Sequence, residues 1–581
     1  MTSNLEIARL LHELASLTEL EEGDRQSFRA RAYHNAVRAI EAHPGAVTLL
    51  SEEELVAIRG VGKAIAKKVR EYAETGRILK LEELRAKFPP GYLDLVRIPG
   101  VGPKTVALLR EHLGVTTVEE LRAAIAAGKL ADVPGLGKKT EENLARDLER
   151  LGLIGKERRT PIIEALPLAE EIVHWLERLP GVERAACAGS LRRFRETIAD
   201  IDIVASASDP AAVTEAFPRM AMVREVVGRG DKKASVRTAK GLQVDLRVVA
   251  PHQWGAAMLY FTGSQAHNIR VRERAVRRGW TLNEYGLFEE DTDRLIASAT
   301  EEEIYAALEM AWVPPGLRED RGECEAAVAG TLPILASQSD LIGDLHVHTA
   351  LSGDGRNTLE EMVETAIASG LHYIAITDHA ENLRLNGITR QAMLAQRAHI
   401  ARLRERYPEI TLLHGAELNI GPEGELDYDE EFLVSFDWCV ASVHSHFRLD
   451  QASQTKRILK AIAHPAVNAV GHLQGRRIGK RRGIDLDVDS VLEAAADTGT
   501  AIEINSHLDR LDAAVEVLWS ARGRGVVFVI NSDAHRTSEF ENLRHGLRQA
   551  ERGWVPADQI ANTWERARFL AWAASKRRGR H

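Results

Sequence analysis

The spacing of apolar residues divides the chain into parts with different expected secondary structure. Up to about residue 155, the apolar residues form short segments with helical spacing. Beyond Pro161 the pattern becomes mixed. Residues 166–179 have the spacing of a helix, whereas residues 183–188, 200–205 and 243–249 read as strands. The middle of the chain is therefore predicted to be α+β.

The C-terminal part repeats one arrangement, in which a short apolar run ends in polar residues. Seven such runs occur, at residues 344–349, 374–377, 412–416, 439–443, 467–471, 501–504 and 526–530. Segments with helical spacing, such as residues 358–369 and 489–496, separate most of them. Strands that alternate with helices predict a distorted seven-stranded β/α barrel, in which functional residues gather at the carboxyl ends of the strands.

Two of the strands predicted in the middle part carry aspartates. Asp200 and Asp202 are two residues apart, which puts both carboxylates on one face of a strand, and Asp245 lies in a second alternating run. Three converging carboxylates would repel one another without a cation, and such oxygen ligands suit Mg²⁺. Two ions of this kind can activate an attacking oxygen and stabilise a leaving one. The alternative is a set of solvated aspartates at a sheet edge.

A glycine-containing segment lies just upstream of these aspartates. Gly189 offers a bare backbone and Ser190 a hydroxyl, which together could hold a phosphate. Arg192 and Arg193 could neutralise the remaining negative charge. The order of glycine, hydroxyl, arginines and aspartates therefore indicates a site for a phosphorylated substrate.

The N-terminal third contains a repeated Gly-apolar-Gly motif. The copies are Gly60-Val61-Gly62-Lys63, Gly100-Val101-Gly102-Pro103-Lys104 and Gly135-Leu136-Gly137-Lys138. Each copy lies between two short helical segments, which predicts a repeated helix–turn–helix hairpin. The glycines permit a tight turn, and the first amides of the second helix favour an anion. A plain hairpin with glycine in its turn is the alternative, but the repetition favours phosphate binding.

Length and composition restrict the possible classes of protein. A chain of 581 residues is too long for one core, so we expect about three to five domains. No run of apolar residues approaches a membrane span, and the N-terminus lacks an export signal. The three scattered cysteines then lead us to expect a reducing cytoplasm. The net charge of −9 excludes only a chain that is basic throughout.

The motif of Gly189, Ser190 and two arginines, followed by the aspartates, resembles the nucleotidyltransferase palm of family X DNA polymerases, the DNA polymerase beta group. The segment Tyr260–Ser264 with Asn283–Tyr285 resembles the part of that family that contacts sugar, base and minor groove. The resemblance implies that the aspartates are catalytic and bind Mg²⁺ or Mn²⁺: Asp200, Asp202 and Asp245. It implies nucleotide or template contacts at these residues: Gly189, Ser190, Arg193, Tyr260, Phe261, Gly263, Asn268 and Arg272.

Two residues depart from the pattern of that family. Gln265 stands where the family has an acid near the incoming base, and Gln243 stands where it has an arginine two residues before the third aspartate. Nucleotide affinity and control of the metal state are therefore expected to differ.

The Gly-apolar-Gly copies resemble helix-hairpin-helix modules, which hold DNA phosphates without reading sequence. The resemblance implies DNA contacts at Gly60, Gly62, Lys63, Gly100, Gly102, Lys104, Gly135, Gly137 and Lys138.

In the polymerase beta group, the first such domain carries a lysine that forms a Schiff base with a 5′-deoxyribose phosphate. The matching position here is Lys68, with Tyr33 and Arg29 where the family has a tyrosine and a basic phosphate ligand. A Schiff-base lysine needs a lowered pKa, for which Lys67 is one source. Ala64 replaces a phosphate-binding lysine of the family, and the alternative is a solvated basic face.

The histidine-rich C-terminal part resembles the polymerase-and-histidinol-phosphatase (PHP) domain, whose members bind up to three metals and hydrolyse phosphoesters. The resemblance implies the ligands His346, His348, Asp354, His379, Glu417, His444, His472, Asp533 and His535. Imidazole and carboxylate ligands suit Mn²⁺, Zn²⁺ or Fe²⁺, and we expect two or three ions. Asp354 occupies a position that is His in some relatives. His446 is a weaker candidate for a substrate contact, because its spacing of two from His444 would point both rings the same way. Residues 576–580 are expected to be a solvated end, with a DNA contact as the alternative.

These observations predict a multidomain protein with an all-α helix-hairpin-helix region, an α+β palm with fingers, and a C-terminal α/β barrel. The expected segments are a lyase-like domain at 1–80, a DNA-binding domain at 81–155, a palm at 156–250, a fingers-like nucleotide-selection domain at 251–316, a linker at 317–340 and a PHP domain at 341–581.

The predicted function is template-directed DNA synthesis that fills short gaps in base-excision repair, with a 3′–5′ exonuclease or 3′-end phosphoesterase in the PHP domain. The expected partners are gapped or primed DNA and dNTPs, with no membrane, for a monomer in a bacterial cytoplasm. One alternative is a DNA-binding module fused to a small-molecule phosphatase. Another is a DNA-end scaffold with vestigial sites, against which the complete ligand sets argue.

Overall fold

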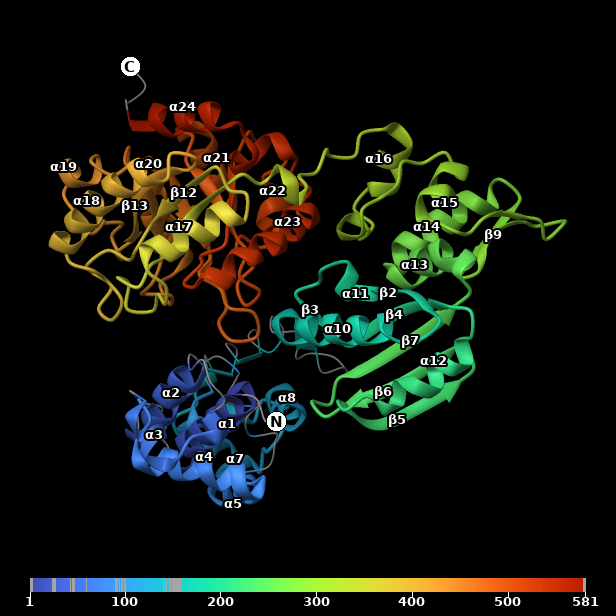
Figure 1. The fold of residues 1–581 in the computed structure, drawn as a ribbon, viewed down its shortest axis with the longest axis horizontal. Coiled ribbons are helices and arrows are strands. Elements are labelled where there is room, and N and C mark those ends of the chain that lie inside the picture. Colours follow the sequence, from blue (N-terminus) through green and yellow to red (C-terminus); the bar gives the residue numbers. More distant parts are fainter. Residues whose placement is uncertain are drawn as a thin grey trace. The chain divides into compact units, whose positions relative to one another are not determined.

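In the computed structural model the chain forms two compact units, residues 1–157 with 479–482 and residues 158–478 with 483–581 (Figure 1). The structure describes residues 4–22, 28–41, 43, 47–58, 60–88, 92, 95, 98, 101–138, 140–141, 144–145, 148 and 159–577. Among the described helices, none combines the length and the apolar character that a membrane span requires.

The first unit is helical in its described part. Its α-helices are α1 (Asn4–Glu22), α2 (Phe28–Glu41), α3 (Glu52–Ala57), α4 (Lys63–Thr75), α5 (Leu79–Lys87), α7 (Pro103–Leu113) and α8 (Val118–Ala126). Helices α3 and α8 begin with capping boxes, in which Ser51 and Thr117 accept from the backbone N–H three residues later. Apolar residues from all of these helices form one core, so the unit has a single hydrophobic interior.

The repeated motif folds the same way in its three copies. In each copy the central apolar residue is buried, and its N–H donates at 2.9 Å to the carbonyl three residues earlier: Val61 to Ile58, Val101 to Ile98 and Leu136 to Val133. Gly62 and Gly102 are the N-caps of α4 and α7, without a side-chain cap. The predicted hairpins are therefore present, with their first helical amides left for another acceptor.

The second unit begins with a five-stranded sheet of order β2-β4-β7-β6-β5. The elements of this part of the chain are β1 (Thr160–Pro161), α10 (Ile162–Glu177), β2 (Val182–Cys187), α11 (Gly189–Arg192), β3 (Thr197–Ile198), β4 (Asp200–Ala207), α12 (Pro210–Ala216), β5 (Val223–Gly230), β6 (Lys233–Thr238) and β7 (Gln243–Val249). Strands β1 and β3 form a separate two-stranded sheet. Strands β4 and β7 are parallel neighbours, and Asp202 pairs with Asp245 in their register. The α+β palm is therefore as predicted.

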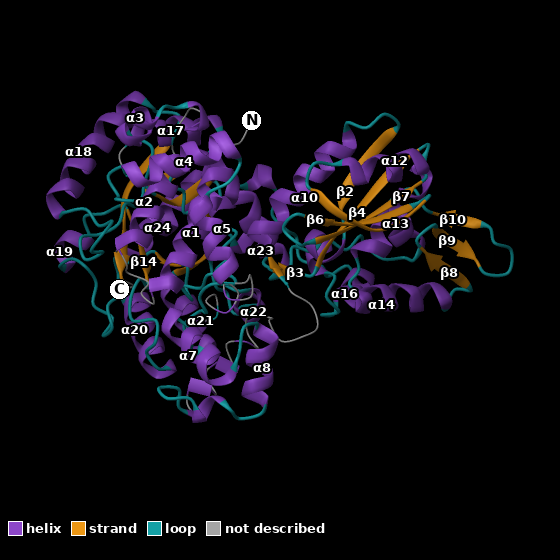
Figure 2. Ribbon diagram, turned by 90° about the horizontal axis from the view of Figure 1, so that it is seen from below, coloured by secondary structure: helices purple, strands orange, loops and turns teal. Residues whose placement is uncertain are grey.

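A smaller subdomain follows the palm. It contains α13 (Trp254–Thr262), α14 (Gln265–Val276), β8 (Trp280–Asn283), β9 (Gly286–Glu289), β10 (Leu295–Ala297) and α15 (Glu301–Ala307). Strands β8 to β10 form an antiparallel sheet beside these helices, which Figure 2 shows in orange next to the larger sheet. Residues 317–340, which we expected to be a linker, contain α16 (Glu323–Ala329) and bury Leu317 and Ala327 in the subdomain's core. The segment is ordered because it supplies apolar contacts.

The C-terminal part is a seven-stranded parallel sheet in sequence order, β11 to β17. The strands are β11 (Gly343–Val347), β12 (Tyr373–Ile376), β13 (Thr411–Asn419), β14 (Trp438–Ser442), β15 (Ala469–Gly471), β16 (Ala501–Asn505) and β17 (Phe528–Asn531). A parallel bridge from Val347 to Ala534 brings the two edges together. The α-helices around it are α17 (Leu359–Ala368), α18 (Arg390–Arg406), α19 (Glu430–Leu433), α20 (Gln451–Ala463), α21 (Val488–Thr498), α22 (Val515–Ser520), α23 (Leu543–Arg552) and α24 (Arg566–Arg577).

The barrel packs directly on the palm and the smaller subdomain. Leu508 and Leu511 from the barrel join the apolar core of the palm, and Trp554 joins the core that contains α13 and α15. The buried contacts explain why these parts form one compact unit.

Candidate active sites

The palm places its aspartates on neighbouring strands. Asp200 and Asp202 lie on one face of β4, and the register of the parallel strands sets Asp202 directly opposite Asp245 on β7. Burial and the nearby charges of Asp200 and Asp245 raise the pKa of Asp202 to about 7. Burial is the largest cause, and a divalent cation would relieve the repulsion between the carboxylates that adds to it, so the donor set fits such an ion.

Two neighbours orient the carboxylate of Asp245. Ser235 Oγ donates to Asp245 Oδ1, and Gln243 Nε2 donates to Asp245 Oδ2 at 3.0 Å. Gln243 was noted in the sequence as a departure from an arginine. It still holds the third aspartate, but as a neutral donor, which leaves more negative charge at the site.

The loop upstream of β4 approaches the aspartates closely. Gly189 has φ +57°, and a Cβ added there would lie 1.9 Å from Asp202 Oδ2. The N–H of Ala188 donates to Asp202 O at 2.8 Å, which ties the loop to β4. Only glycine permits this approach, and half-buried Ser190 follows it on the one-turn helix α11.

The two arginines of this loop have different partners. Arg192, which we expected to neutralise phosphate, forms a fork with Glu301 at 2.8 Å for each contact, so its charge is already paired. Arg193 Nε donates to Glu319 Oε1 at 3.0 Å, and its Nη1 donates to Thr262 O. Arg193 therefore extends from the loop to Thr262 and Glu319, and an acidic side chain of this chain pairs with it.

Residues predicted to contact the nucleotide come from α13 and α14. Asn268 Nδ2 donates to Tyr260 O at 2.7 Å, and Arg272 Nε donates to Asn268 O at 3.3 Å. The side chains of these residues line one small pocket together with Asn283. Phe261 packs edge-on against Tyr260 with ring centroids 5.1 Å apart, and Gly263, at φ +65°, lies beside Arg193. The structure therefore brings this predicted set together.

The predicted lyase residue lies on α4 in the first unit. Lys68 Nζ lies 5.9 Å from the ring centroid of Tyr33, and Lys68 is half-buried. Burial lowers the pKa of Lys68, with smaller contributions from Lys80 and Arg29. Burial is therefore the largest cause, rather than the neighbouring Lys67 that the sequence suggested.

The predicted DNA-contact residues cluster at the hairpin turns. Lys63 is the first residue of α4, and Lys104 and Lys138 occupy the corresponding first turns. Gly100 lies outside the described residues. The other predicted glycines, Gly60, Gly62, Gly102, Gly135 and Gly137, lie in these turns or cap the helix that follows.

In the barrel, Glu417 at the carboxyl end of β13 is the centre of one group of histidines. His379 Nδ1 lies 2.7 Å from Glu417 Oε2, and His472 Nε2 lies 2.9 Å and His444 Nε2 3.1 Å from Oε1. His346 and His348, on β11 and directly after it, approach Glu417 Oε2 at 3.4 and 3.6 Å. One carboxylate therefore faces five imidazoles.

Asp354 and Asp533 complete the predicted set. Asp533 Oδ1 lies 3.3 Å from His348 Nε2, and Asp354 Oδ2 lies 3.4 Å from His379 Nε2 and 3.5 Å from His535 Nε2. Asp533 has φ +54°, a left-handed conformation that bends the chain after β17 toward the cluster. All nine predicted ligands therefore lie at the same end of the barrel.

The donor set in the barrel fits divalent metal ions. Several ring and carboxylate atoms of the cluster are buried and have no hydrogen-bond partner within the described part of the chain: His346 Nε2, both nitrogens of His348, Asp354 Oδ1 and Glu417 Oε2. Burial and the neighbouring His535 and His379 lower the pKa of His348 to about 3. Against the effect of burial, Glu417 and Asp354 raise the pKa of His379 to about 10. At neutral pH His348 is therefore in the neutral form that ligates a metal, whereas His379 carries a proton that a bound metal ion would displace.

Residues behind the cluster were missed in the sequence. Glu503 on β16 is fully buried and accepts from His346 Nδ1 at 2.7 Å and from the N–H of His472 at 2.6 Å. Asn419 Oδ1 lies 2.8 Å from His444 Nδ1. Contacts of this kind select which ring nitrogen faces the metal. The only sequence signal was the alternation along β16, which puts Glu503 and Asn505 on one face.

Two expectations for the barrel need correction. His446 is exposed with φ +56°, and β14 ends at Ser442, so its ring does not share a strand face with His444 as assumed. Lys576, expected in a solvated end, lies on α24 and donates to Val467 O and Thr500 Oγ1. Burial lowers the pKa of Lys576 to about 7. Residues 578–581 lie outside the described part of the chain.

Comparison with protein families identifies the parts in the same order. A helix-hairpin-helix domain matches residues 2–78, and a SAM-like helix-hairpin-helix tandem matches residues 92–150. The DNA polymerase beta thumb matches residues 257–319, a segment that we expected to be fingers-like, and the PHP domain matches residues 344–507. The fold and its sites therefore define a polymerase beta-type protein that carries a PHP domain.

A relative that matches nearly the whole chain agrees with this class. The chain is 35% identical over 561 residues to the DNA polymerase/3′-5′ exonuclease PolX of Bacillus subtilis. The matched region covers 96% of this chain and 97% of that protein. It is also 30% identical over 239 residues to a probable phosphatase of Vibrio campbellii and over 233 residues to one of Thermoanaerobacter, covering 39% and 38% of this chain and 91% of each relative. The chain belongs to the PolX family of family X DNA polymerases with a PHP domain.

Proposed function

We propose that the palm catalyses template-directed addition of dNTPs to a primer 3′ end in short gaps of DNA during base-excision repair. The observation that carries this proposal is the pairing of Asp202 with Asp245 on parallel strands, beside a glycine loop that only a residue without Cβ can form. The relationship to the Bacillus PolX over nearly the whole chain supports the same activity.

The residues of the palm have separate roles in this proposal. Gly189 N–H and Ser190 Oγ donate to phosphate oxygens of the dNTP, and Arg193, held in place by Glu319 and Thr262, balances their charge. Asp245 accepts a hydrogen bond from the primer 3′-OH, held in orientation by Ser235. Mg²⁺ or Mn²⁺ bound by the three aspartates would supply the positive charge that stabilises the reacting phosphates.

Tyr260 and Asn268 lie where they could test the shape of the incoming nucleotide. They line one pocket with Arg272, and Asn268 donates to the backbone of Tyr260. In this proposal Tyr260 and Phe261 exclude a 2′-OH, Asn268 contacts the minor-groove edge of the new pair, and Arg272 contacts the template.

We propose that the barrel is a metal-dependent 3′–5′ exonuclease that shortens or unblocks DNA 3′ ends. The convergence of nine His, Asp and Glu side chains at one end of the barrel carries this proposal. Two or three Mn²⁺, Zn²⁺ or Fe²⁺ ions bound there would polarise a phosphodiester and neutralise its charge. Arg510, whose Nε lies 3.6 Å from Asp533 Oδ2, adds a further positive charge at the cluster.

One experiment separates the two activities. A one-nucleotide-gapped duplex with a labelled primer is incubated in Mn²⁺ with and without dNTPs, using the native chain, Asp200→Asn and His346→Ala. Asp200→Asn should lower extension about a hundredfold or more and leave shortening unchanged, and His346→Ala should do the reverse.

Matched variants control for unspecific damage in this experiment. Asp209→Asn changes an aspartate just beyond β4 that caps α12, and His399→Ala changes a histidine on α18 that is paired with Glu360. Both should retain both activities. Persistent shortening by His346→Ala would refute the barrel as the nuclease, and absence of extension by the native chain would refute the palm proposal.

We also propose a 5′-deoxyribose phosphate lyase activity for Lys68. Its half-buried amine, its lowered pKa and its contact with Tyr33 support the proposal, because a neutral amine is the nucleophile of a Schiff base. Borohydride should trap a DNA adduct on the native chain and not on Lys68→Ala. Lys67→Ala changes the adjacent exposed lysine and should keep the adduct, so equal trapping by both variants would end the proposal.

The helix-hairpin-helix turns are proposed to hold gapped or primed DNA through its phosphates. Gly62 and Gly102 cap their helices without a side chain, so the first amides and Lys63 or Lys104 can face a phosphate. Affinity should then fall with salt concentration. We also propose that the chain acts on DNA as a monomer in a bacterial cytoplasm.

A further inference from the structure

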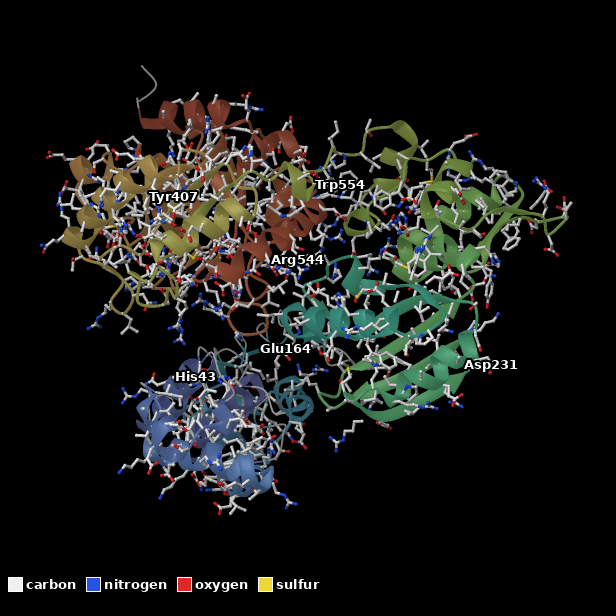
Figure 3. The ribbon with its side chains drawn as sticks, in the orientation of Figure 1. His43, Glu164, Asp231, Tyr407, Arg544 and Trp554 are labelled. Carbon is white, nitrogen blue, oxygen red and sulfur yellow. The ribbon has the colours of Figure 1, made fainter. Side chains whose placement is uncertain are left out.

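Helix α23 of the barrel contacts the glycine loop of the palm. Arg548 Nη2 donates to the backbone carbonyl of Arg192 at 2.5 Å. The ring of His545 stacks on Phe194, with centroids 6.1 Å apart and planes 21° apart. Arg544, labelled in Figure 3, lies at the start of the same helix and pairs with Glu170 of α10 at 3.2 Å. A helix of the nuclease domain therefore supports the loop from outside the palm.

The same helix also holds the last residues of the thumb. Arg548 Nη1 donates to Glu551 Oε2 at 2.9 Å, and Glu551 Oε1 accepts from the N–H of Gly316 at 2.6 Å. A Cβ on Gly316 would lie 2.6 Å from Glu551 Oε1, so the fit is close. We call residues 313–319 the thumb strap. Arg548 and Glu551 thus join the palm loop to the thumb strap.

The thumb strap returns to the arginines of the loop. Arg318, which is fully buried, donates from Nη1 to Glu301 Oε1 at 2.7 Å, and Glu301 accepts both contacts of Arg192. Glu319 accepts from Arg193 at 3.0 Å. The contacts form a closed circuit from the loop to the thumb, the strap, α23 and back to the loop.

The loop depends on such contacts because it has little structure of its own. Helix α11 is a single turn; its first residue, Gly189, has φ +57°, and Phe194, two residues beyond its end, has φ +59°. A loop of this kind keeps its shape through the side chains that pack on it. A small displacement of a positioning group can change a substrate interaction strongly.

We propose that Arg548 and Glu551 of the PHP domain are positioning residues for dNTP binding at the palm. The inference rests on the proposed role of Ser190 and Arg193 in holding the triphosphate. Neither residue touches the substrate. Arg548 fixes the loop through the Arg192 carbonyl, and Glu551 fixes the strap that bears Glu319.

The test measures KM for dNTP and kcat on saturating one-nucleotide-gapped DNA for the full chain and Arg548→Met. KM should rise about tenfold while kcat changes less than about threefold, because the aspartates keep their places. Exonuclease activity in Mn²⁺ should equal that of the native chain. Arg548→Lys, which can serve one acceptor at a time, should give an intermediate KM.

Arg404→Met is the matched control. Arg404 also joins a carbonyl to a carboxylate, donating to Leu412 O at 2.8 Å and to Asp437 Oδ2 at 2.5 Å, but within the barrel. It should leave KM for dNTP unchanged. Glu551→Gln is the second variant, used if Arg548→Met fails to fold, and it should also raise KM.

The outcomes separate this inference from the polymerase proposal. If the native chain extends the primer and both α23 variants keep the native KM, the inference is wrong and the polymerase proposal stands. A loss of exonuclease equal to the loss of dNTP affinity would also overturn it, because general damage to the barrel would then be the cause. A native chain without extension would refute the polymerase proposal itself.

Discussion

Arg476 joins the barrel to the palm, and its removal provides the sharpest test of their packing. Its two terminal nitrogens contact the carboxylate of Glu196 at 2.7 and 3.0 Å, and it also donates to Leu511 O. Although burial raises the pKa of Glu196, Arg476 lowers it below its usual range. Arg476→Met therefore leaves a charged, partly buried carboxylate at the interface without its partner.

The contacts indicate the size of the effect. Removing one partner of a buried ion pair costs about 3–5 kcal/mol. Glu196 keeps 25% of its side chain exposed and Arg476 keeps 13%, so solvent reduces the loss and the lower end, about 3 kcal/mol, is expected. For a compact unit made of residues 158–478 and 483–581, an unfolding entropy of about 2.1 cal/mol/K per residue means that this free energy lowers the melting temperature by about 3–4 °C.

Scanning calorimetry of the full chain measures the change, and a double-mutant cycle assigns it. Glu196→Gln removes the charge, and the double variant should recover about 1–3 kcal/mol relative to the sum of the single variants. Arg524→Met, which breaks the exposed contact with Asp489, should cost about 1 kcal/mol or less. Additive single variants, or an Arg476→Met chain that melts with the native one, would refute the reasoning.

Three further changes test other parts of the molecule. Gly189→Ala should reduce extension about a hundredfold with normal exonuclease activity, because its Cβ would lie 1.9 Å from Asp202 Oδ2. Lys576, whose pKa burial lowers to about 7, binds fewer protons in the folded chain than in the unfolded one between pH 7 and 10.5. Melts should therefore show the native chain gaining stability over Lys576→Met as pH rises, by at most about 1.4 kcal/mol per pH unit. Glu503→Gln should lower exonuclease activity about 10–100-fold and leave extension unchanged, because it weakens the 2.7 Å contact that orients His346.

Each of these changes has a matched control. Gly181→Ala has a similar positive φ but meets no atom closer than 3.7 Å, so it should keep extension. Lys456→Met removes an exposed lysine of the barrel and should give no pH-dependent difference. Glu430→Gln changes an exposed carboxylate of the same domain and should keep exonuclease activity. Equal behaviour of a variant and its control would contradict the corresponding prediction.

The local chemistry of the sites could be predicted from the sequence. Residues two apart on a strand share a face whatever the rest of the fold does, so Asp200 and Asp202 were placed together. The Gly-apolar-Gly repeats predicted turns because glycine alone accepts their backbone angles without strain, and Gly60 at φ +104° and Gly135 at φ +86° agree. Polar residues at the ends of alternating strands predicted the barrel cluster for the same geometric reason.

Contacts between distant segments were decided only by the tertiary structure. The register of β4 and β7 set Asp202 opposite Asp245. The packing of the thumb brought Glu301 to Arg192, so the two side chains pair. Glu503 was overlooked because its partner lies 157 residues away. Sequence patterns report the conformation of neighbouring residues, whereas pairing of charges depends on which surfaces meet after folding. Which surfaces come into contact is determined by the burial of entire helix and sheet faces, and no local sequence pattern encodes that burial.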